Sequence, residues 1–197
     1  MSAVSWIVLA VVLLLVFWAV GAFNRLTRLK NAIANAFGQI DVQLKRRYDL
    51  IPNLVEVARK YLAHEAQTLE AVIAARNQAR SAEQSAAASP LNAGAIGALA
   101  GAEQVLGGAL GRLFAVAEAY PDLKADQTMR ELSEELSSTE NRIGFARQAY
   151  NDHVLEFNDA AAQFPALIVA RLFNFQPQSM LQSTQNEAER AAVKVVF

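Results

Sequence analysis

The sequence predicts an all-α protein in which an N-terminal transmembrane helix continues into a long antiparallel helical bundle of about four helices. Three observations support this fold class. Residues 3–23 are apolar and carry no charge. Over most of the remaining chain, apolar residues recur in steps of three and four, the spacing of one helix face. No stretch of useful length alternates apolar and polar residues as a half-buried strand does. We therefore expect a membrane anchor with a short external N-terminus at 1–24, a cytoplasmic bundle at 25–175 and a C-terminal tail at 176–197.

The anchor is predicted from the length of the uncharged stretch at residues 3–23. As a helix it is roughly 31 Å long, which matches a hydrocarbon core of about 30 Å. Trp6 and Trp18 lie near its two ends, where interfacial aromatic residues are common. A cleaved signal peptide needs a basic segment before the apolar run, and residues 1–5 contain none.

The flanking charges predict the orientation of the anchor. Arg25, Arg28 and Lys30 follow the apolar stretch directly, and basic residues stay on the cytoplasmic side. The N-terminus is then outside and the body inside, with these three side chains near anionic headgroups. Because residues 22–37 contain neither proline nor glycine, we expect the membrane helix to continue into the body as a stiff stalk.

Residues 40–65 form the stretch around which the rest of the chain is organised, and they combine a helical apolar repeat with a dense charge cluster. The cluster consists of Asp41, Lys45, Arg46, Arg47 and Asp49. Pro52 follows it; proline lacks an N–H and disfavours the α conformation in the preceding residue. We therefore expect a kink or break at Pro52, with Asp49 as a cap and a second helix running from Pro52 to the early 80s.

The middle of the chain is rich in small residues. Residues 81–92 are predicted to form a loop or a frayed helix end. For residues 93–111, with six glycines, two interpretations are open: a flexible crossover, or a helix whose small residues let a neighbouring helix approach. We favour a loop to about Gly101 and a third helix to Ala119. A second membrane span is not expected, because Glu103, Gln104 and Arg112 interrupt the apolar run.

A long helix is predicted after the Tyr120-Pro121 turn. Thr128 and Glu131 have capping-box spacing. The apolar repeat that follows contains Met129, Leu132, Leu136, Thr139, Ile143, Ala146, Tyr150, Val154, Phe157, Ala161 and Phe164. Pro165 should kink or restart this helix, leaving a short apolar helix at 166–175. The tail ends in an apolar segment, 193–197, which either docks on the bundle or pairs with a partner as a strand.

Several of these stretches resemble the LemA family of bacterial membrane proteins. The resemblance is carried by residues 40–47 and 49–55, which hold Asp41, Lys45, Arg46, Arg47, Asp49 and Pro52, and by Tyr120-Pro121, Glu140-Asn141, Arg147, Asn151 and Phe164-Pro165. It implies an N-terminal membrane helix with a small external N-terminus and a helical bundle. It does not specify a molecular function.

The residues that usually carry chemistry are scarce. The chain has no cysteine and two histidines. His64-Glu65 begins like a zinc-binding HExxH motif, but Thr68 occupies the position of the second histidine, and a tetrahedral zinc site needs three or four ligands. We therefore expect no catalytic, metal-binding or cofactor-binding residues. The formal net charge of −1 gives no bulk basic character and predicts no nucleic-acid partner.

The polar residues of the long helix allow two interpretations. They are either a pocket completed by Arg46 or Arg47, or interhelical hydrogen bonds and ion pairs that fix the register of the bundle. We favour the second, because polar groups often have that role and no nucleophile or base is evident. The residues concerned are Glu140, Asn141, Arg142, Arg147, Asn151 and Asn158.

Two non-enzymatic functions are consistent with these features. The first is a self-associating scaffold in the bacterial cytoplasmic (inner) membrane, whose partners are the lipid bilayer and other copies of the chain. The second is an adaptor, or a stress-linked partner of a membrane protease or signalling protein.

Overall fold

The computed structural model describes residues 3–181, and within that range the chain forms six α-helices and no strand. The helices are α1 (Ala3–Arg59), α2 (Ala66–Ala88), α3 (Ala93–Ala117), α4 (Pro121–Ala125), α5 (Gln127–Ala162) and α6 (Ala166–Leu172). The prediction of an all-α fold is confirmed.

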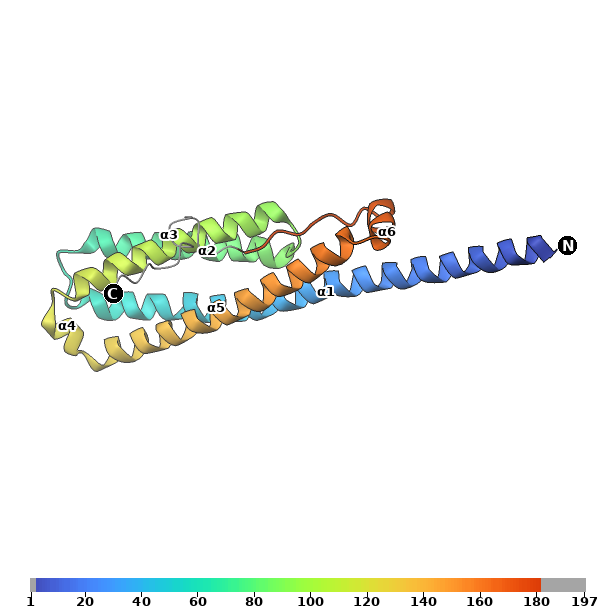
Figure 1. Cartoon of the computed structure of the whole chain (residues 1–197). Coiled ribbons are helices and arrows are strands. Elements are labelled where there is room, and N and C mark those ends of the chain that lie inside the picture. The colour runs from blue at the N-terminus through green and yellow to red at the C-terminus, as the bar shows by residue number, and fades with distance from the viewer. Residues whose placement is uncertain (1–2, 182–197) are drawn as a thin grey trace, which may run out of the picture.

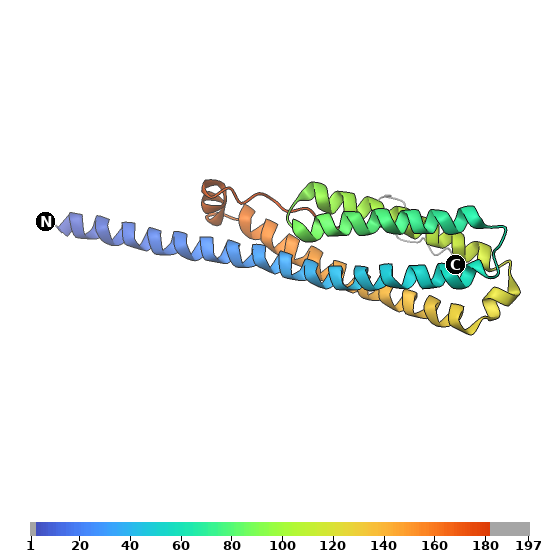
Figure 2. The same cartoon turned by 180° about the vertical axis from the view of Figure 1, so that it is seen from behind.

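Helix α1 is the axis of the molecule. Its C-terminal part packs against α5 and α2, and α3 packs on α2. Its N-terminal part projects beyond the bundle as a single rod (Figures 1 and 2). No residue of its most apolar 18-residue stretch is buried against the rest of the protein. The length and composition of this projecting part are those of a membrane span.

The predicted break at Pro52 is wrong, because α1 continues through the proline to Arg59. Proline removes the N–H that normally bonds the carbonyl four residues earlier, here that of Tyr48. The Tyr48 carbonyl instead accepts a hydrogen bond from Nε of Arg76 in α2, at 2.9 Å. Asp49, the predicted cap, lies inside the helix. The chain turns only at residues 60–65, and α2 begins at Ala66 rather than at Pro52.

Helices α2 and α3 are both longer than predicted. Helix α2 runs to Ala88, so only residues 89–92 form the connecting loop. Helix α3 begins at Ala93, where the side chain of Asn92 accepts a hydrogen bond from the backbone N–H of Ala95 at 3.0 Å. Such a cap satisfies a backbone donor that has no partner within the helix. The glycine-rich stretch is therefore a helix, and the preferred loop up to Gly101 is wrong.

Asp126, not Thr128, caps α5, because its side chain accepts from the backbone N–H of Met129 at 2.9 Å. The apolar repeat of α5 is confirmed from Met129 to Ala161, where every predicted member is buried or half-buried. Phe164 lies beyond the end of the helix and is 82% exposed, so its assignment to the repeat is wrong.

The two shortest helices differ in small ways from prediction. Tyr120 ends the preceding turn, and Pro121 occupies the first turn of α4, where the missing N–H is tolerated. Helix α6 ends at Leu172, three residues before its predicted end. The predicted apolar ending at 193–197 lies outside the described residues.

Candidate functional site

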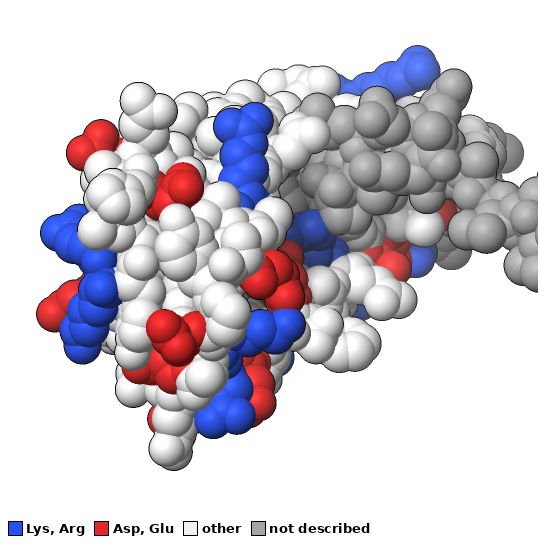
Figure 3. All heavy atoms as spheres, turned by 90° about the vertical axis from the view of Figure 1, so that its left-hand side faces the viewer, with Lys and Arg blue, Asp and Glu red and all other residues white. Residues whose placement is uncertain are grey.

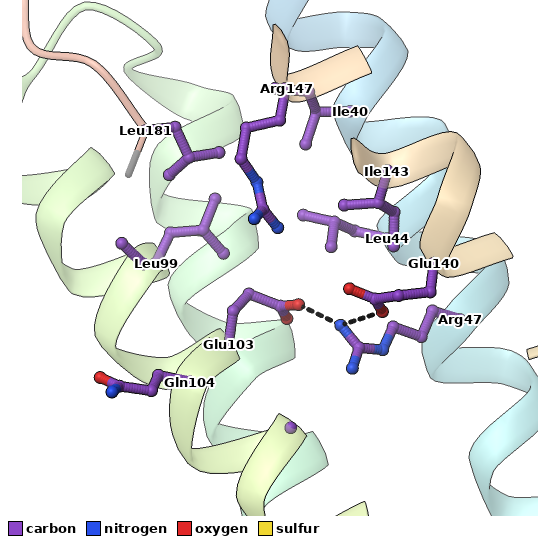
Figure 4. A pocket seen from close by; sticks show the side chains of 12 residues that line it. Ile40, Leu44, Arg47, Leu99, Glu103, Gln104, Glu140, Ile143, Arg147 and Leu181 are labelled. Carbon is purple, nitrogen blue, oxygen red and sulfur yellow. Dashed lines mark hydrogen bonds and ion pairs between the residues drawn. The ribbon is translucent and has the colours of Figure 1, made fainter. Parts of the chain in front are cut away.

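A cavity of about 140 Å³ lies between α1, α3 and α5, and four charged side chains line it (Figure 4). Its lining consists of Ile40, Leu44 and Arg47 of α1, Leu99, Ala100, Glu103, Gln104 and Gly107 of α3, Glu140, Ile143 and Arg147 of α5, and Leu181.

Arg47 is the centre of an ionic cluster in this cavity. Its side chain is buried, and Nη1 lies 2.7 Å from Oε2 of Glu103 and 3.0 Å from Oε2 of Glu140. The hydroxyl of Tyr48 donates to the other oxygen of Glu103 at 2.5 Å. One arginine thus ties α1 to both α3 and α5, while Glu103 holds two neighbouring residues of α1.

Arg147 brings a second cation to the cavity. Its guanidinium points inward from α5, between Leu99 and Leu181 (Figure 4). Its Nε is buried and has no hydrogen-bond partner among residues 3–181. Two arginines and two glutamates therefore line the cavity, and their formal charges balance.

The contacts of this cluster join α1 to α3 and α5 through ion pairs. A guanidinium stays protonated at physiological pH and does not act as a base. Burial first, and then the adjacent Glu103 carboxylate, raises the pKa of Tyr48, so its hydroxyl is a hydrogen-bond donor rather than a nucleophile. Removing one partner from a buried ion pair leaves an uncompensated charge, so clusters of this kind can hold helices in one register.

A second buried cluster joins α1 to α2. Oδ2 of Asp41 lies 2.6 Å from Nζ of Lys45, which is also 3.8 Å from Oε1 of Glu83. Burial, and then a hydrogen bond to Asp41, raises the pKa of Glu83 to about 7. Burial alone would raise the pKa of Asp41, but hydrogen bonds from Glu83 and Lys45 bring it below its ordinary value. Of the two carboxyl groups, Glu83 therefore has the higher pKa and Asp41 the lower.

Two asparagines of α5 bind the extended segment that follows α6. The amide of Asn158 accepts from the backbone N–H of Gln178 at 2.8 Å and donates to its carbonyl at 3.0 Å. Asn151 makes the same pair with Leu181, at 2.9 and 3.2 Å. At two points an asparagine amide thus bonds the backbone N–H and C=O of one residue, as a neighbouring β-strand would. These bonds hold residues 178–181 along α5.

The structure brings some of the predicted site residues together and separates others. Arg47, Glu140 and Arg147 meet in the cavity. Arg46 instead pairs with Glu135 at 2.6 Å near the surface, and Asn141 and Arg142 are exposed. Positive and negative side chains are interspersed at the end of the bundle opposite the N-terminus (Figure 3).

Sequence reasoning missed Glu103 and Glu83 as members of buried clusters. A signal existed for Glu103, because it is the one acidic residue between residues 84 and 117. A lone charge in an apolar helix calls for a partner. Glu83 lies in an alanine- and serine-rich stretch whose helical face was not evident.

The fold and the ionic cluster around Arg47 define a class of protein. Its members are membrane-associated helical bundles with an apolar N-terminal helix. The model of the LemA family matches residues 36–197, which include the charge cluster, the cavity and the asparagine pair. The chain belongs to the LemA family.

The chain is also similar to three magnetosome proteins. Magnetosome protein MamQ of Magnetospirillum gryphiswaldense is 28% identical over 151 residues, which cover 69% of this chain and 56% of that protein. MamQ 1 and MamQ 2 of Paramagnetospirillum magneticum are each 28% identical over 157 residues, covering 72% of this chain and 58% of the relative. The chain therefore spans little more than half the length of these relatives.

Proposed function

We propose that this protein is a non-catalytic scaffold of the bacterial cytoplasmic membrane, anchored by residues 3–23 and self-associating through the outer face of α3. The body lies in the cytoplasm, since Arg25, Arg28 and Lys30 follow the apolar stretch. The observation that carries the proposal is a glycine-rich helix face that α2 covers only in part.

This glycine face of α3 consists of Gly97, Gly101, Val105 and Gly108, at helical spacing. A Cβ built at any of the three glycines meets no atom within 4 Å, and Val105 is 53% exposed. Each glycine in a helix costs about 1 kcal/mol relative to alanine. Val105 and Gly108 border a hollow that they share with Ala71 and Ala75 of α2, so the described chain covers this face only in part.

A partner helix gives these small residues a role, because glycines allow two helix backbones to approach closely. Helix α3 contains a window apolar enough to cross a membrane, of which 33% is buried. Glu103 nonetheless ties α3 to Arg47 and Tyr48 within the bundle, so its exposed apolar face is available to a second copy of the protein. Anchoring in the plane of a membrane raises the effective concentration of copies for one another.

Site-directed crosslinking tests the self-association. Because the chain has no native cysteine, any disulfide must involve the introduced cysteine. In native membranes, Val105→Cys should form disulfide-linked dimers. Phe145→Cys, on α5 and 74% exposed, is the matched control and should not. Adding Gly108→Leu to the first variant should abolish its dimers, while Gly144→Leu, where a Cβ also meets nothing within 4 Å, should leave them. Equal yields at positions 105 and 145, with a monomeric mass in mild detergent, would sink the proposal.

A reporter at the C-terminus tests the orientation. An enzyme that is active only outside the cytoplasm, fused after Phe197, should be silent. A fusion to a reporter that is active only in the cytoplasm controls for expression and should be active. Strong activity of the first fusion would reverse the orientation.

The alternative function is an adaptor, favoured by a separate feature. A groove of about 260 Å³ lies between α3, α4 and α5, lined mainly by apolar side chains such as Phe114, Leu123 and Met129. It is large enough for a side chain of a partner protein. A strictly monomeric chain that co-purifies with one defined membrane protein, and loses it on Phe114→Glu at the half-buried position of the groove, would favour the adaptor.

A further inference from the structure

The turn between α5 and α6 brings the chain back to α1 at the end of the uncharged stretch. The ring of Phe23 packs edge-on against Phe173 and Phe175, with centroid distances of 4.9 and 5.6 Å. Phe164 and Pro165 line a hollow shared with Trp18, Gly21 and Arg25 of α1. Helix α6 therefore lies beside α1 where the projecting rod begins (Figures 1 and 2).

Four large apolar side chains in this region are exposed over more than half of their surface, including Phe173, one side of which packs against Phe23. Phe164 is 82% exposed, Ile168 56%, Leu172 76% and Phe173 53%; we name these four residues the apolar foot. Ile168 and Leu172 are four apart and share one face of α6, whereas Val169 and Ala170 are buried against the body. A cluster of exposed apolar residues of this size marks an interaction surface.

Basic side chains flank the apolar foot, and the nearest acidic residue before it in sequence is Asp159 in the last turn of α5. No acidic residue occurs between residues 160 and 186. Arg171 lies within α6, and Arg25 and Arg28 are exposed on the adjacent turns of α1. Apolar residues that penetrate an interface, flanked by arginines at headgroup level, are typical of helices that lie on anionic membranes.

We propose that the apolar foot inserts into the same bilayer surface from which α1 emerges, so that the body is attached to the membrane at two points. This inference rests on the proposed function, since it requires residues 3–23 to span the bilayer. Trp18 and Gly21 of α1 belong to that span, and Phe164 and Pro165 lie level with them. At that level the surroundings of an outward-facing side chain are lipid rather than water or a second copy of the body.

This attachment explains one feature of the chain and has one consequence for its geometry. Phe164 and Pro165 are exposed, so the core does not account for their presence among the residues that carry the family resemblance. A second attachment point also prevents the body from swivelling about α1, which would hold the outer face of α3 at a fixed angle to the membrane plane.

Depth measurements on single-cysteine variants test the proposal. The full chain is placed in nanodiscs at one copy per disc, which removes protein neighbours, and a fluorophore is attached at Ile168→Cys or Leu172→Cys. Phe145→Cys on α5 is the aqueous control, and Leu13→Cys is the control within the span. Fluorescence is quenched either by iodide in the water or by spin-labelled lipid.

We expect iodide quenching at positions 168 and 172 to be about fivefold weaker than at 145, with strong quenching by headgroup-proximal spin labels. If iodide quenches labels at 168 and 172 as strongly as at 145 while position 13 is protected, the apolar foot does not insert, although residues 3–23 still span the bilayer. Iodide quenching at position 13 as well would instead refute the span, and with it the proposed function.

A second measurement separates membrane insertion from folding. Because Leu172 is exposed, Leu172→Asp should leave the melting temperature in detergent unchanged. In discs, the same change should raise iodide quenching of a label at 168 severalfold. Unchanged quenching at 168 would contradict insertion of this face.

Discussion

The continuation of α1 through Pro52 depends on Arg76, and this dependence can be measured as an energetic coupling. Pro52 leaves the Tyr48 carbonyl without its helical partner, and Nε of Arg76 supplies the missing donor at 2.9 Å. Pro52→Ala restores the N–H four residues after Tyr48, so the carbonyl no longer needs the arginine. Arg76→Met removes the donor while keeping most of the side-chain bulk.

The magnitude follows from burial and charge. The Arg76 side chain is 13% exposed. Its Nη2 also lies 4.0 Å from Oδ1 of Asp49, but the Asp49 side chain is 75% exposed, so this ion pair contributes little. A hydrogen bond with one charged partner contributes about 1.5–3 kcal/mol. We expect Arg76→Met to lower the free energy of unfolding by about 2–3 kcal/mol in the parent, and by about 1–2 kcal/mol less in the Pro52→Ala background.

The assay is a double-mutant cycle on the full chain in mild detergent, with urea unfolding followed by circular dichroism. Arg80→Met is the control, since Arg80 is exposed one turn further along α2, and its effect should be the same in both backgrounds. If Arg76→Met has the same effect with and without Pro52, the arginine does not replace the lost backbone bond and our explanation of the unbroken helix is wrong.

Three further predictions concern the buried clusters and the segment after α6. The pKa of Glu83 is about 7 in the folded chain against 4.5 for a free side chain, so its stabilisation is complete below about pH 4.5 and is lost as the pH rises through about 7. Urea unfolding should show the parent weakening from about pH 4.5 to 7 and Glu83→Gln changing less. Equal pH dependence of the two proteins would contradict the raised pKa of Glu83. Ile143→Asp places a carboxylate at a fully buried position and should lower the free energy of unfolding by several kcal/mol. The control Phe145→Asp should leave the melting temperature unchanged. Equal melting temperatures of the two variants would contradict the packing of α5. Asn158→Ala removes two backbone hydrogen bonds and should speed tryptic cleavage at Arg171 severalfold, and an unchanged cleavage rate would show that the amide does not hold the segment.

The buried faces of α1 and α5 were predictable from sequence, because a helix has one period and burial repeats with it. Leu26, Ile33 and Ile40 are almost fully buried, at the spacing that the sequence displays. Both helices are long enough for this period to be unambiguous.

The passage through Pro52 was not predictable in the same way. Local rules favour a break at a proline, and they were overridden by Arg76, which lies 28 positions away. The start of α3 differs from prediction for a related reason: a high glycine content lowers helix propensity, and the cap formed by Asn92 offsets this at the first turn.

The candidate site was predictable only in part. The charges of α1 and α5 allow a pocket that contains Arg47, Glu140 and Arg147, and these three residues line one cavity. The third contributor, Glu103, is 56 positions from Arg47, and nothing in the spacing of either helix relates the two. Which polar side chains share a cavity depends on how the helices pack together, which a single sequence does not specify.

The pairing of α1 with α5 also determines the order in which the chain can fold during synthesis. Arg46 and Glu135, which join the two helices, are 89 positions apart. At roughly 5–20 residues per second, the apolar face of α1 waits about 5–20 s on the ribosome before its main partner emerges. Helices α2 and α3 are neighbours in sequence and form a hairpin in the meantime. Until α5 arrives, the stripe of α1 that it will cover is exposed, and this interval is when the nascent chain most needs a chaperone.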